Sequence, residues 1–238
     1  MIDFITVQEE IFMEEGCTFY FVRHGQTYFN HYKRMQGWSN TPLTPQGRED
    51  VRRSGRGLAD VEFDAAYTSD LSRTIETATI ILEENKKGKD LTLKSMPEFR
   101  EVFFGSFEGS DVDETWAKVN ETMGYSSVAE MWAETSIPEQ MNAFKKADPY
   151  HDAEDFLTFW LRVEQGLLKL INKHRDTGDK VMIVAHGNTI RYLLNNLVPE
   201  LENPQPLLNA SVSAVKYYNG KYHLEVYNEV GHFKDSEN

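Results

Sequence analysis

The sequence is poor in cysteine and in long apolar runs. Its single cysteine, Cys17, excludes an intramolecular disulfide and any structural zinc site made of several cysteines. No apolar run approaches the roughly 18 residues that a membrane-spanning helix requires. The first sixteen residues carry five acidic groups and no basic region of the kind that begins a secretory signal. We therefore expect a cytoplasmic protein without a membrane partner.

Basic residues are also scarce. The chain has 25 Lys and Arg against 38 Asp and Glu, which gives a formal net charge of −13. Because phosphate backbones are bound by an excess of Lys and Arg, we do not expect a nucleic-acid partner. The acidic excess is concentrated in one segment. Residues 108–155 hold twelve acidic and three basic side chains, so −9 of the −13 lies there.

The remaining composition is that of a folded domain. Hydrophobic residues make up 40% and charged residues 26% of a 238-residue chain, which is enough for a sizeable core. The sequence shows no internal repeats and no low-complexity segments. We expect one domain over residues 1–238, in which residues 1–16 are an N-terminal extension and residues from about 108 to 155 form an acidic helical cap insertion.

Strand and helix patterns alternate along the chain. They predict strands at 18–23, 63–68, 91–96 and 180–185, and helices at 44–58, 70–84, 155–173 and 189–196. Thr44 and Asp70 are expected to begin their helices as caps, and Pro138 to break the helical cap. Asn219-Gly220, between two alternating runs, is a strong hairpin signal. The fold class is α/β: a three-layer αβα sandwich, mainly parallel, with a C-terminal hairpin.

Two hydrophobic strands end in a histidine followed by a glycine. His24-Gly25 follows the run FYFVR, and His186-Gly187 follows MIVA. A single histidine in a loop is more often structural than functional. In open α/β sheets, however, ligands bind beyond the carboxyl ends of the strands, so two strands would deliver both histidines to one edge. The pair together therefore predicts one shared pocket.

With these motifs the sequence resembles the histidine phosphatase superfamily, on the branch that includes cofactor-dependent phosphoglycerate mutases. The likeness runs from Tyr20 to about Leu194. Each motif is weak alone, but their common order is specific. They are R-H-G-Q-T at 23–27 with Asn30, Q-G at 36–37, P-L-T at 42–44, S-D-L-S-R-T at 69–74, F-R-E at 99–101, F-E-G at 107–109, and A-H-G at 185–187 with Arg191.

The resemblance implies that His24 is the nucleophile and becomes phosphorylated, which divides a difficult hydrolysis into two easier steps. It also implies that Arg23, Asn30, Arg73 and His186 bind the phosphoryl group, with His186 counted among the catalytic residues. Fixed guanidinium groups can neutralise the developing charge, so the resemblance implies no metal and no cofactor. The expected partner is a small-molecule phosphate ester, and a homodimer is left open.

The resemblance further implies that Glu101 protonates the leaving-group oxygen and later takes a proton from water. That role requires a carboxyl group that holds its proton near neutral pH. Glu108 is the alternative acid. The other histidines lack metal-ligand spacing and are expected to be structural or at the surface: His31, His151, His174, His223 and His232. Trp116 and Trp132 could line a pocket, although large aromatic residues in such helices more often serve packing.

Three functions remain open at this stage. Mutases of this family carry basic residues after the acid glutamate to hold a bisphosphate, whereas residues 110–128 here contain only Lys118. We therefore favour a phosphatase over a mutase, and expect the acidic cap to repel highly anionic substrates and to prefer a monophosphate with a neutral, polar or cationic remainder. A non-catalytic phosphate-binding or scaffold protein is the third alternative, which the presence of every implied catalytic residue disfavours.

Overall fold

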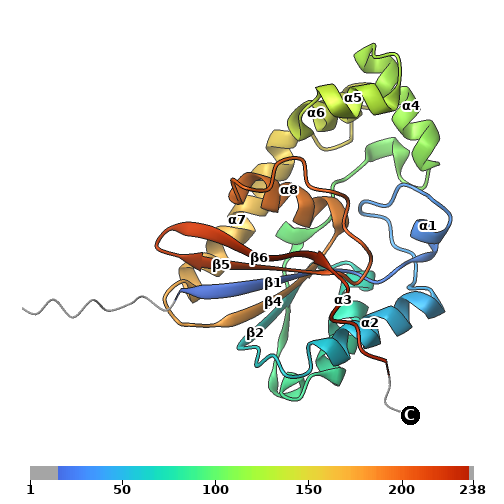
Figure 1. Ribbon diagram of the computed structural model, residues 1–238. Helices are drawn as coiled ribbons and strands as arrows, with labels where there is room; N and C mark the ends of the chain where they lie inside the picture. The colour runs from blue at the N-terminus through green and yellow to red at the C-terminus, as the bar shows by residue number, and fades with distance from the viewer. Residues whose placement is uncertain (1–15, 236–238) are drawn as a thin grey trace, which may run out of the picture.

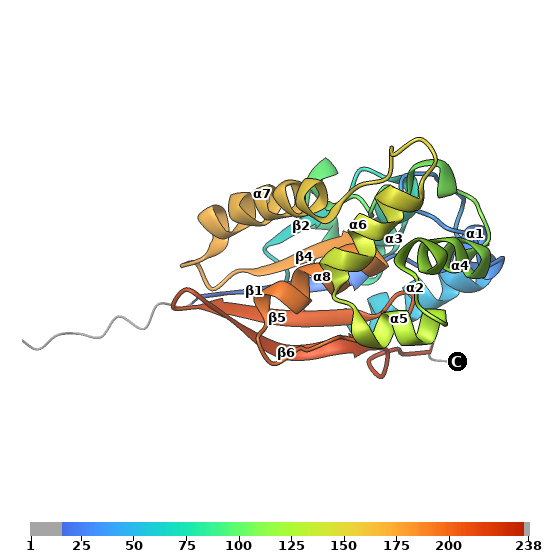
Figure 2. The ribbon, with the colours of Figure 1, turned by 90° about the horizontal axis from the view of Figure 1, so that it is seen from above.

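The computed structural model describes residues 16–235, and these form a sheet of six strands (Figure 1). The strands run in the order β3-β2-β4-β1-β5-β6. Figure 2 shows β2, β4, β1, β5 and β6 in this order from above. The first four are mutually parallel, β5 is antiparallel to β1, and β5 and β6 form a hairpin. Their bounds are β1 Cys17–Arg23, β2 Ala65–Thr68, β3 Leu93–Ser95, β4 Lys180–Ala185, β5 Val212–Tyr218 and β6 Lys221–Glu229. The predicted mainly parallel sheet with a C-terminal hairpin is confirmed.

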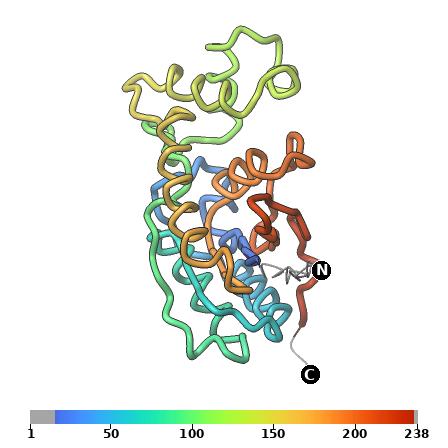
Figure 3. Tube along the Cα trace, turned by 90° about the vertical axis from the view of Figure 1, so that its left-hand side faces the viewer, coloured from blue at the N-terminus to red at the C-terminus, as the bar shows by residue number. Residues whose placement is uncertain are grey.

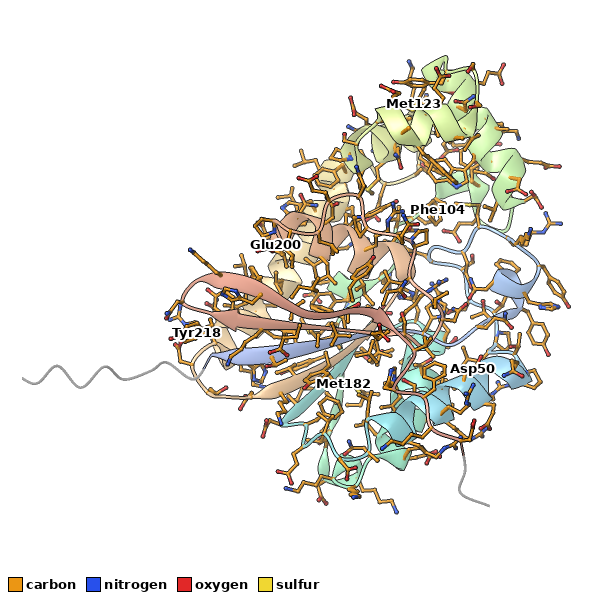
Figure 4. All side chains as sticks on the ribbon, in the orientation of Figure 1. Asp50, Phe104, Met123, Met182, Glu200 and Tyr218 are labelled. Carbon is orange, nitrogen blue, oxygen red and sulfur yellow. The ribbon has the colours of Figure 1, made fainter. Side chains whose placement is uncertain are left out.

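Both faces of the central strands are buried, which explains why β1 and β4 read as nearly continuous apolar runs. Side chains alternate between the two faces of a strand. Ile183 and Phe21 pack into one apolar cluster, while Met182 and Val22 pack into another on the opposite face. Met182 is labelled within the sheet in Figure 4. The two clusters make the two cores of a three-layer sandwich.

Two pairs of helices supply the outer layers. Helices α2 (Pro45–Gly57) and α3 (Ser72–Glu84) contribute to the cluster that contains Met182. Helices α7 (Phe156–His174) and α8 (Gly187–Leu197) contribute to the cluster that contains Phe21. A short helix, α1 (Tyr28–His31), follows β1, and three 3-10 turns cover Gly88–Asp90, Pro97–Phe99 and Gly105–Phe107.

Three more helices form a separate cluster at one end of the molecule, which we call the helical cap (Figures 1 and 3). They are α4 (Val112–Met123), α5 (Val128–Glu134) and α6 (Ile137–Ala147). Asp111, Ser127 and Ser136 accept hydrogen bonds from the first backbone N–H groups of these helices, which fixes where each one begins. Their inward residues include Met131 and Phe144, both buried.

Several predicted boundaries are wrong. Asp70 does not cap α3, because its carboxylate is held by the Arg100 guanidinium at 2.7 and 2.5 Å; the cap residue is Leu71. Pro138 does not break a helix but lies in the first turn of α6, where its missing N–H is not needed. The predicted strands at 63–68 and 91–96 shorten to β2 and β3, and α8 begins two residues earlier than predicted.

Other predictions hold at the level of single residues. Thr44 caps α2 by accepting a 2.9 Å hydrogen bond from the Gly47 N–H, and Pro45 stands in the first turn. The predicted extension at 1–16 falls almost wholly outside the described residues. Within residues 16–235, no helix is both long and apolar enough to cross a membrane.

Candidate active site

The two His-Gly motifs meet at the carboxyl ends of β1 and β4. These strands are neighbours in parallel register, with Arg23 opposite Ala185, and the His24 N–H donates to the Ala185 carbonyl at 3.1 Å. The ring centres of His24 and His186 are 5.3 Å apart, with the rings inclined at 64°. The structure thus brings together the two histidines that the sequence places on separate strands.

His24 is held as a neutral imidazole with its Nε2 lone pair facing the site. Its Nδ1 lies 2.8 Å from the Gly25 carbonyl, which can only accept, so Nδ1 carries the hydrogen. The Nε2 atom then accepts a 3.2 Å hydrogen bond from Arg73 Nε. Burial, followed by the charges of Arg73 and Arg23, lowers the pKa of His24 well below its usual value. A buried, unprotonated Nε2 is what a nucleophilic imidazole requires.

Arg73 is almost completely buried and is fixed by the chain around it. Besides His24 Nε2, its guanidinium donates to the Ser39 carbonyl at 2.9 Å, to Asn40 Oδ1 at 3.2 Å and to the Gly37 carbonyl at 2.6 Å. Burial lowers the pKa of Arg73 to about 10, so the group stays charged at neutral pH. The loop 37–40 therefore sets the orientation of a permanent cation beside the His24 nitrogen.

Arg23 reaches the same site from the end of β1. Its Nη1 donates to the Leu207 carbonyl, while its buried Nε has no hydrogen-bond partner among residues 16–235. A Cβ atom at Gly187 would lie only 3.1 Å from this Nε, so glycine at the start of α8 gives the guanidinium its space. The unpaired N–H is available to a phosphoryl oxygen.

His186 has one ring nitrogen hydrogen-bonded and one without a partner among residues 16–235. Its Nε2 lies 2.8 Å from the Ser69 hydroxyl, which in turn lies 2.8 Å from the Thr74 hydroxyl. Its Nδ1 is buried and has no partner within the described residues. Buried polar atoms without a partner are rare, so this nitrogen is a candidate contact for a bound ligand. Ser69 and Thr74 were not assigned roles from the sequence, although both belong to its S-D-L-S-R-T motif.

Glu101 lies at the amino end of α8. Its Oε1 accepts from the backbone N–H groups of Val102 and Thr189, both at 3.0 Å, and from the Thr189 hydroxyl at 3.1 Å. Its Oε2 accepts one bond, from the Asn188 N–H at 3.0 Å, and so retains a lone pair for the pocket. Burial raises the pKa of Glu101 despite these donors and the nearby arginines. The carboxyl group is therefore able to hold a proton at a higher pH than an exposed glutamate.

Two residues that sequence reasoning missed hold the Glu101 backbone in place. Arg162 of α7 donates to the carbonyls of Glu98, Arg100 and Glu101 and forms a 2.7 Å ion pair with Glu154. Trp38 Nε1 donates to the Glu101 carbonyl at 2.8 Å. No sequence signal distinguishes Arg162 from other charged residues of an amphipathic helix.

Asn30 stands on α1 with its amide oxygen already engaged. Its Oδ1 accepts from the Thr27 N–H at 3.2 Å and from Asn209 Nδ2 at 3.3 Å, which directs the Asn30 amide nitrogen away from both. Asn209, which the sequence did not single out, also donates to the His24 carbonyl at 3.1 Å. The loop before β5 thus ties α1 to the end of β1.

Glu108, the alternative acid, has a different position. Its carboxylate accepts from the backbone N–H groups of Gly37, Trp38 and Ser39 at 3.0–3.1 Å, and from that of Phe104 at 3.2 Å. It therefore fastens the loop that orients Arg73. Among the other histidines, His174 is buried between Tyr67 and Asp179, and His232 contacts Ser54. No three His, Cys, Asp or Glu side chains in residues 16–235 are grouped so as to hold a metal ion.

A pocket of about 210 Å³ opens above His24. The charged residues that line it are Arg23, Arg34, Glu101 and Arg191. The helical cap contributes a mostly apolar wall to it: Val112, Trp116, Gln140, Met141 and Phe144. Phe104, labelled in Figure 4 between the sheet and the helical cap, lines it as well.

Four acidic residues of segment 108–155 stabilise the local structure through hydrogen bonds and an ion pair. Asp111 and Asp155 cap helices, Glu154 pairs with Arg162, and Asp148 accepts hydrogen bonds from Ser106 and Ala153. No acidic residue of this segment lines the pocket, and the wall that the helical cap contributes to it is uncharged.

Trp116 shows both of the roles expected from the sequence, packing and lining a pocket. Trp116 packs edge-to-face on Phe144 at 4.7 Å and also lines the pocket. Trp116 therefore both packs within the helical cap and lines the pocket.

A family model, the histidine phosphatase superfamily (branch 1), matches residues 19–230. A 2,3-bisphosphoglycerate-dependent phosphoglycerate mutase from Parvibaculum lavamentivorans is 32% identical over 83% of this chain and 87% of its own length. The crystal structure of a phosphoglycerate mutase from Bacillus anthracis superimposes with a TM-score of 0.85 and 35% identity, covering 91% of this chain and 94% of that one. The crystal structure of the α-ribazole phosphatase from Shigella flexneri superimposes with a TM-score of 0.67 and 25% identity, covering 93% of this chain and 100% of that one.

Proposed function

This chain belongs to the histidine phosphatase superfamily, and from that premise we propose that it hydrolyses a small phosphate monoester through a phosphohistidine at His24. Membership was expected from the motifs, and it makes the chain one of a group of phosphoryl-transfer enzymes. The site geometry supports the finer assignment. His24 Nε2 is unprotonated and lies beside Arg73, and Arg23 and His186 each have a buried nitrogen without a partner in residues 16–235. Asn30 lines the same pocket as His24 and Arg23.

In the first step, Arg73 Nε gives up its hydrogen bond to His24 Nε2, and the freed Nε2 lone pair attacks phosphorus while the bond from phosphorus to the alcohol oxygen breaks. Nδ1 keeps its hydrogen on the Gly25 carbonyl throughout, so the orientation of the ring does not change. Arg23, Arg73 and His186 donate to the three outer oxygens, whose charge is largest in the transition state. Glu101 gives its proton to the departing alcohol oxygen.

In the second step, Glu101, now a carboxylate, takes a proton from a water molecule that attacks phosphorus from the side vacated by the alcohol. The bond between phosphorus and His24 Nε2 breaks, and inorganic phosphate is released. Because Glu101 regains the proton that it gave up, the cycle returns the enzyme to its starting state. Its raised pKa suits both halves of this exchange.

One observation favours hydrolysis over a mutase reaction: the wall that the helical cap presents to the pocket is apolar. A mutase must retain a doubly phosphorylated intermediate while it turns over, which requires cationic side chains opposite the first phosphate. Here that side consists of Val112, Trp116, Met141 and Phe144 with the neutral Gln140. Lys145, a cation of the helical cap, is paired with Asp155 at 3.0 Å.

A phosphoglycerate mutase is the second candidate. Arg34 and Arg191 line the pocket beyond the phosphoryl site, and either could contact a second anionic group. The Parvibaculum and Bacillus anthracis relatives carry that name. The mutase alternative thus rests on two cations, and the hydrolase proposal on an uncharged opposite wall.

The two functions differ in their products. We would incubate the protein with 3-phosphoglycerate, with and without 2,3-bisphosphoglycerate, and measure 2-phosphoglycerate and free phosphate in parallel with a panel of other monoesters. The proposal predicts free phosphate as the main product. Interconversion of the phosphoglycerates that depends on the bisphosphate, with little free phosphate, would establish the mutase instead. Release of no product from any ester would leave the scaffold alternative.

A further inference from the structure

A second cavity of about 520 Å³ lies beside the phosphate pocket. The helical cap lines one side of it and α8 with the loop 203–206 lines the other. The residues from the helical cap are Trp116, Trp132, Ala133, Ile137 and Gln140. Those opposite are Asn188, Arg191, Tyr192, Asn203, Pro204, Gln205 and Pro206.

The two cavities share a boundary. Six residues line both of them: Trp116, Gln140, Asn188, Arg191, Tyr192 and Pro206. The pocket above His24, at about 210 Å³, is smaller than the roughly 300–1,000 Å³ of common small-molecule sites, whereas the second cavity falls in that range. The first space holds a phosphoryl group and a small alcohol, so a longer alcohol would extend across the shared boundary into the second.

The lining of the second cavity is suited to a flat ring. Trp116 and Trp132 meet edge-to-face at 5.2 Å with an angle of 90° between their planes. Trp132 keeps 51% of its surface exposed, which is unusual for so large an apolar side chain and leaves its ring open to a ligand. Edge-to-face and offset contacts of this kind are favourable between aromatic groups.

Arg191 is the charged residue among those that line the second cavity. Its Nε donates to the Pro204 carbonyl at 2.6 Å, which fixes the guanidinium plane, and its Cζ lies 5.9 Å from the centre of the Tyr192 ring. Within residues 16–235, its two terminal nitrogens have no hydrogen-bond partner. A guanidinium held in this way can stack on the face of an aromatic ring.

We propose that the second cavity binds the alcohol portion of the substrate, and that this portion carries an aromatic ring, which lies between the cap tryptophans and Arg191. The enzyme would then select phosphate monoesters of ring-bearing alcohols over those of short aliphatic alcohols. This inference rests on the proposed hydrolase function and specifies its substrate class.

The test uses three esters whose alcohols are equally good leaving groups: propyl, 3-phenylpropyl and 3-cyclohexylpropyl phosphate. Because each ring is three carbons from the reacting oxygen, differences in kcat/KM report binding rather than chemistry. We expect 3-phenylpropyl phosphate to exceed propyl phosphate by about tenfold or more, and to exceed the cyclohexyl ester clearly, since aromatic contacts add to simple burial. Equal values for the phenyl and cyclohexyl esters would overturn the aromatic assignment.

Variants then locate the ring. Trp132→Ala should reduce the phenylpropyl-to-propyl ratio of kcat/KM severalfold, while Trp132→Phe, which keeps an aromatic surface, should restore most of it. Tyr150→Ala is the matched control, because Tyr150 is an exposed aromatic residue that lines neither cavity. A ratio unchanged in Trp132→Ala would overturn the proposal while leaving the hydrolase function intact. Release of no phosphate from any of the three esters would instead contradict the hydrolase function itself.

Discussion

At the scale of single residues, the site depends on keeping two imidazoles neutral among buried cations. Burial lowers the pKa of both His24 and His186, and the adjacent arginines lower it further. Each ring has one nitrogen fixed by a short hydrogen bond, to the Gly25 carbonyl or to the Ser69 hydroxyl. These hydrogen bonds fix the orientation of both rings, which leaves His24 Nε2 unprotonated and His186 Nδ1 without a partner in residues 16–235.

Replacing Arg73 by lysine tests whether a charge alone is sufficient. An ammonium group cannot reproduce the four directed contacts of the guanidinium with His24, the loop carbonyls and Asn40. We expect kcat/KM for an aryl phosphate to fall by roughly 10²- to 10³-fold, as for loss of one preorganised donor. Arg48→Lys is the matched control, since Arg48 forms a half-exposed ion pair with Glu76. Equal kcat/KM values for Arg73→Lys and wild type would show that the planar guanidinium and its directed contacts are not required.

Glu101→Gln tests the proton-transfer role. Glutamine cannot donate a proton to the leaving oxygen, so alkyl esters, which need that proton, should slow by about 10²- to 10⁴-fold. Aryl esters with good leaving groups should slow much less in their first step. Burst and steady-state rates for 4-nitrophenyl phosphate and for the alkyl ester 3-phenylpropyl phosphate measure the difference, with thermal unfolding as the control for folding. Equal losses on both esters would contradict the assignment.

The pH dependence follows from the same groups. His24 must be neutral to attack, so kcat/KM should fall toward low pH only below the usual histidine range, because its pKa is lowered. Glu101 must be protonated to act as an acid, so kcat/KM for alkyl esters should fall as pH rises through its raised pKa. In Glu101→Gln the high-pH limb should disappear. A high-pH limb that persists in that variant would assign it to another group.

At the scale of elements, the loop 37–40 connects stability with activity. The Glu108 carboxylate accepts hydrogen bonds from three backbone N–H groups of this loop and from that of Phe104. Two carbonyls of the loop accept hydrogen bonds from Arg73. Sequence reasoning could not identify this arrangement, because the loop and Glu108 are about 70 residues apart and no periodic pattern links them. It did identify the caps of α2, where Thr44 and Pro45 act on their own neighbours. The predicted cap at Asp70 was wrong because its carboxylate forms an ion pair with Arg100, which is distant in the sequence.

Glu108→Gln should therefore destabilise the protein and reduce its activity together. Loss of the charge leaves buried N–H groups with weaker or missing acceptors, which costs about 1–3 kcal/mol in the free energy of unfolding. Glu121→Gln, at an exposed position on α4, is the control. Urea unfolding and kcat/KM for an aryl phosphate should both change in Glu108→Gln and neither in Glu121→Gln. Unchanged stability of Glu108→Gln would mean that the loop is held by other contacts.

At the scale of the whole molecule, the strand order explains why the fold and the meeting of the two His-Gly motifs were predictable. Parallel strands β1 and β4 are adjacent, so motifs that are about 160 residues apart in sequence end at one edge. The direction in which the acidic cap faces was not predictable, because it depends on how α4–α6 dock against the sheet rather than on their composition. The −13 net charge is consequently a property of the outer surface, while the pocket combines arginines with apolar walls.

The central claim is a phosphoryl group carried by His24. The most direct measurement is to mix the enzyme with excess 4-nitrophenyl phosphate, stop the reaction in alkali, where phosphohistidine survives, and map the modified peptide. We expect the phosphoryl group on His24, and we expect it to accumulate further in Glu101→Gln because attack by water is slowed. In His24→Ala, both the phosphoryl group and turnover should be absent. A phosphoryl group on His186 or on a hydroxyl side chain, or full phosphate release by His24→Ala, would contradict the central claim.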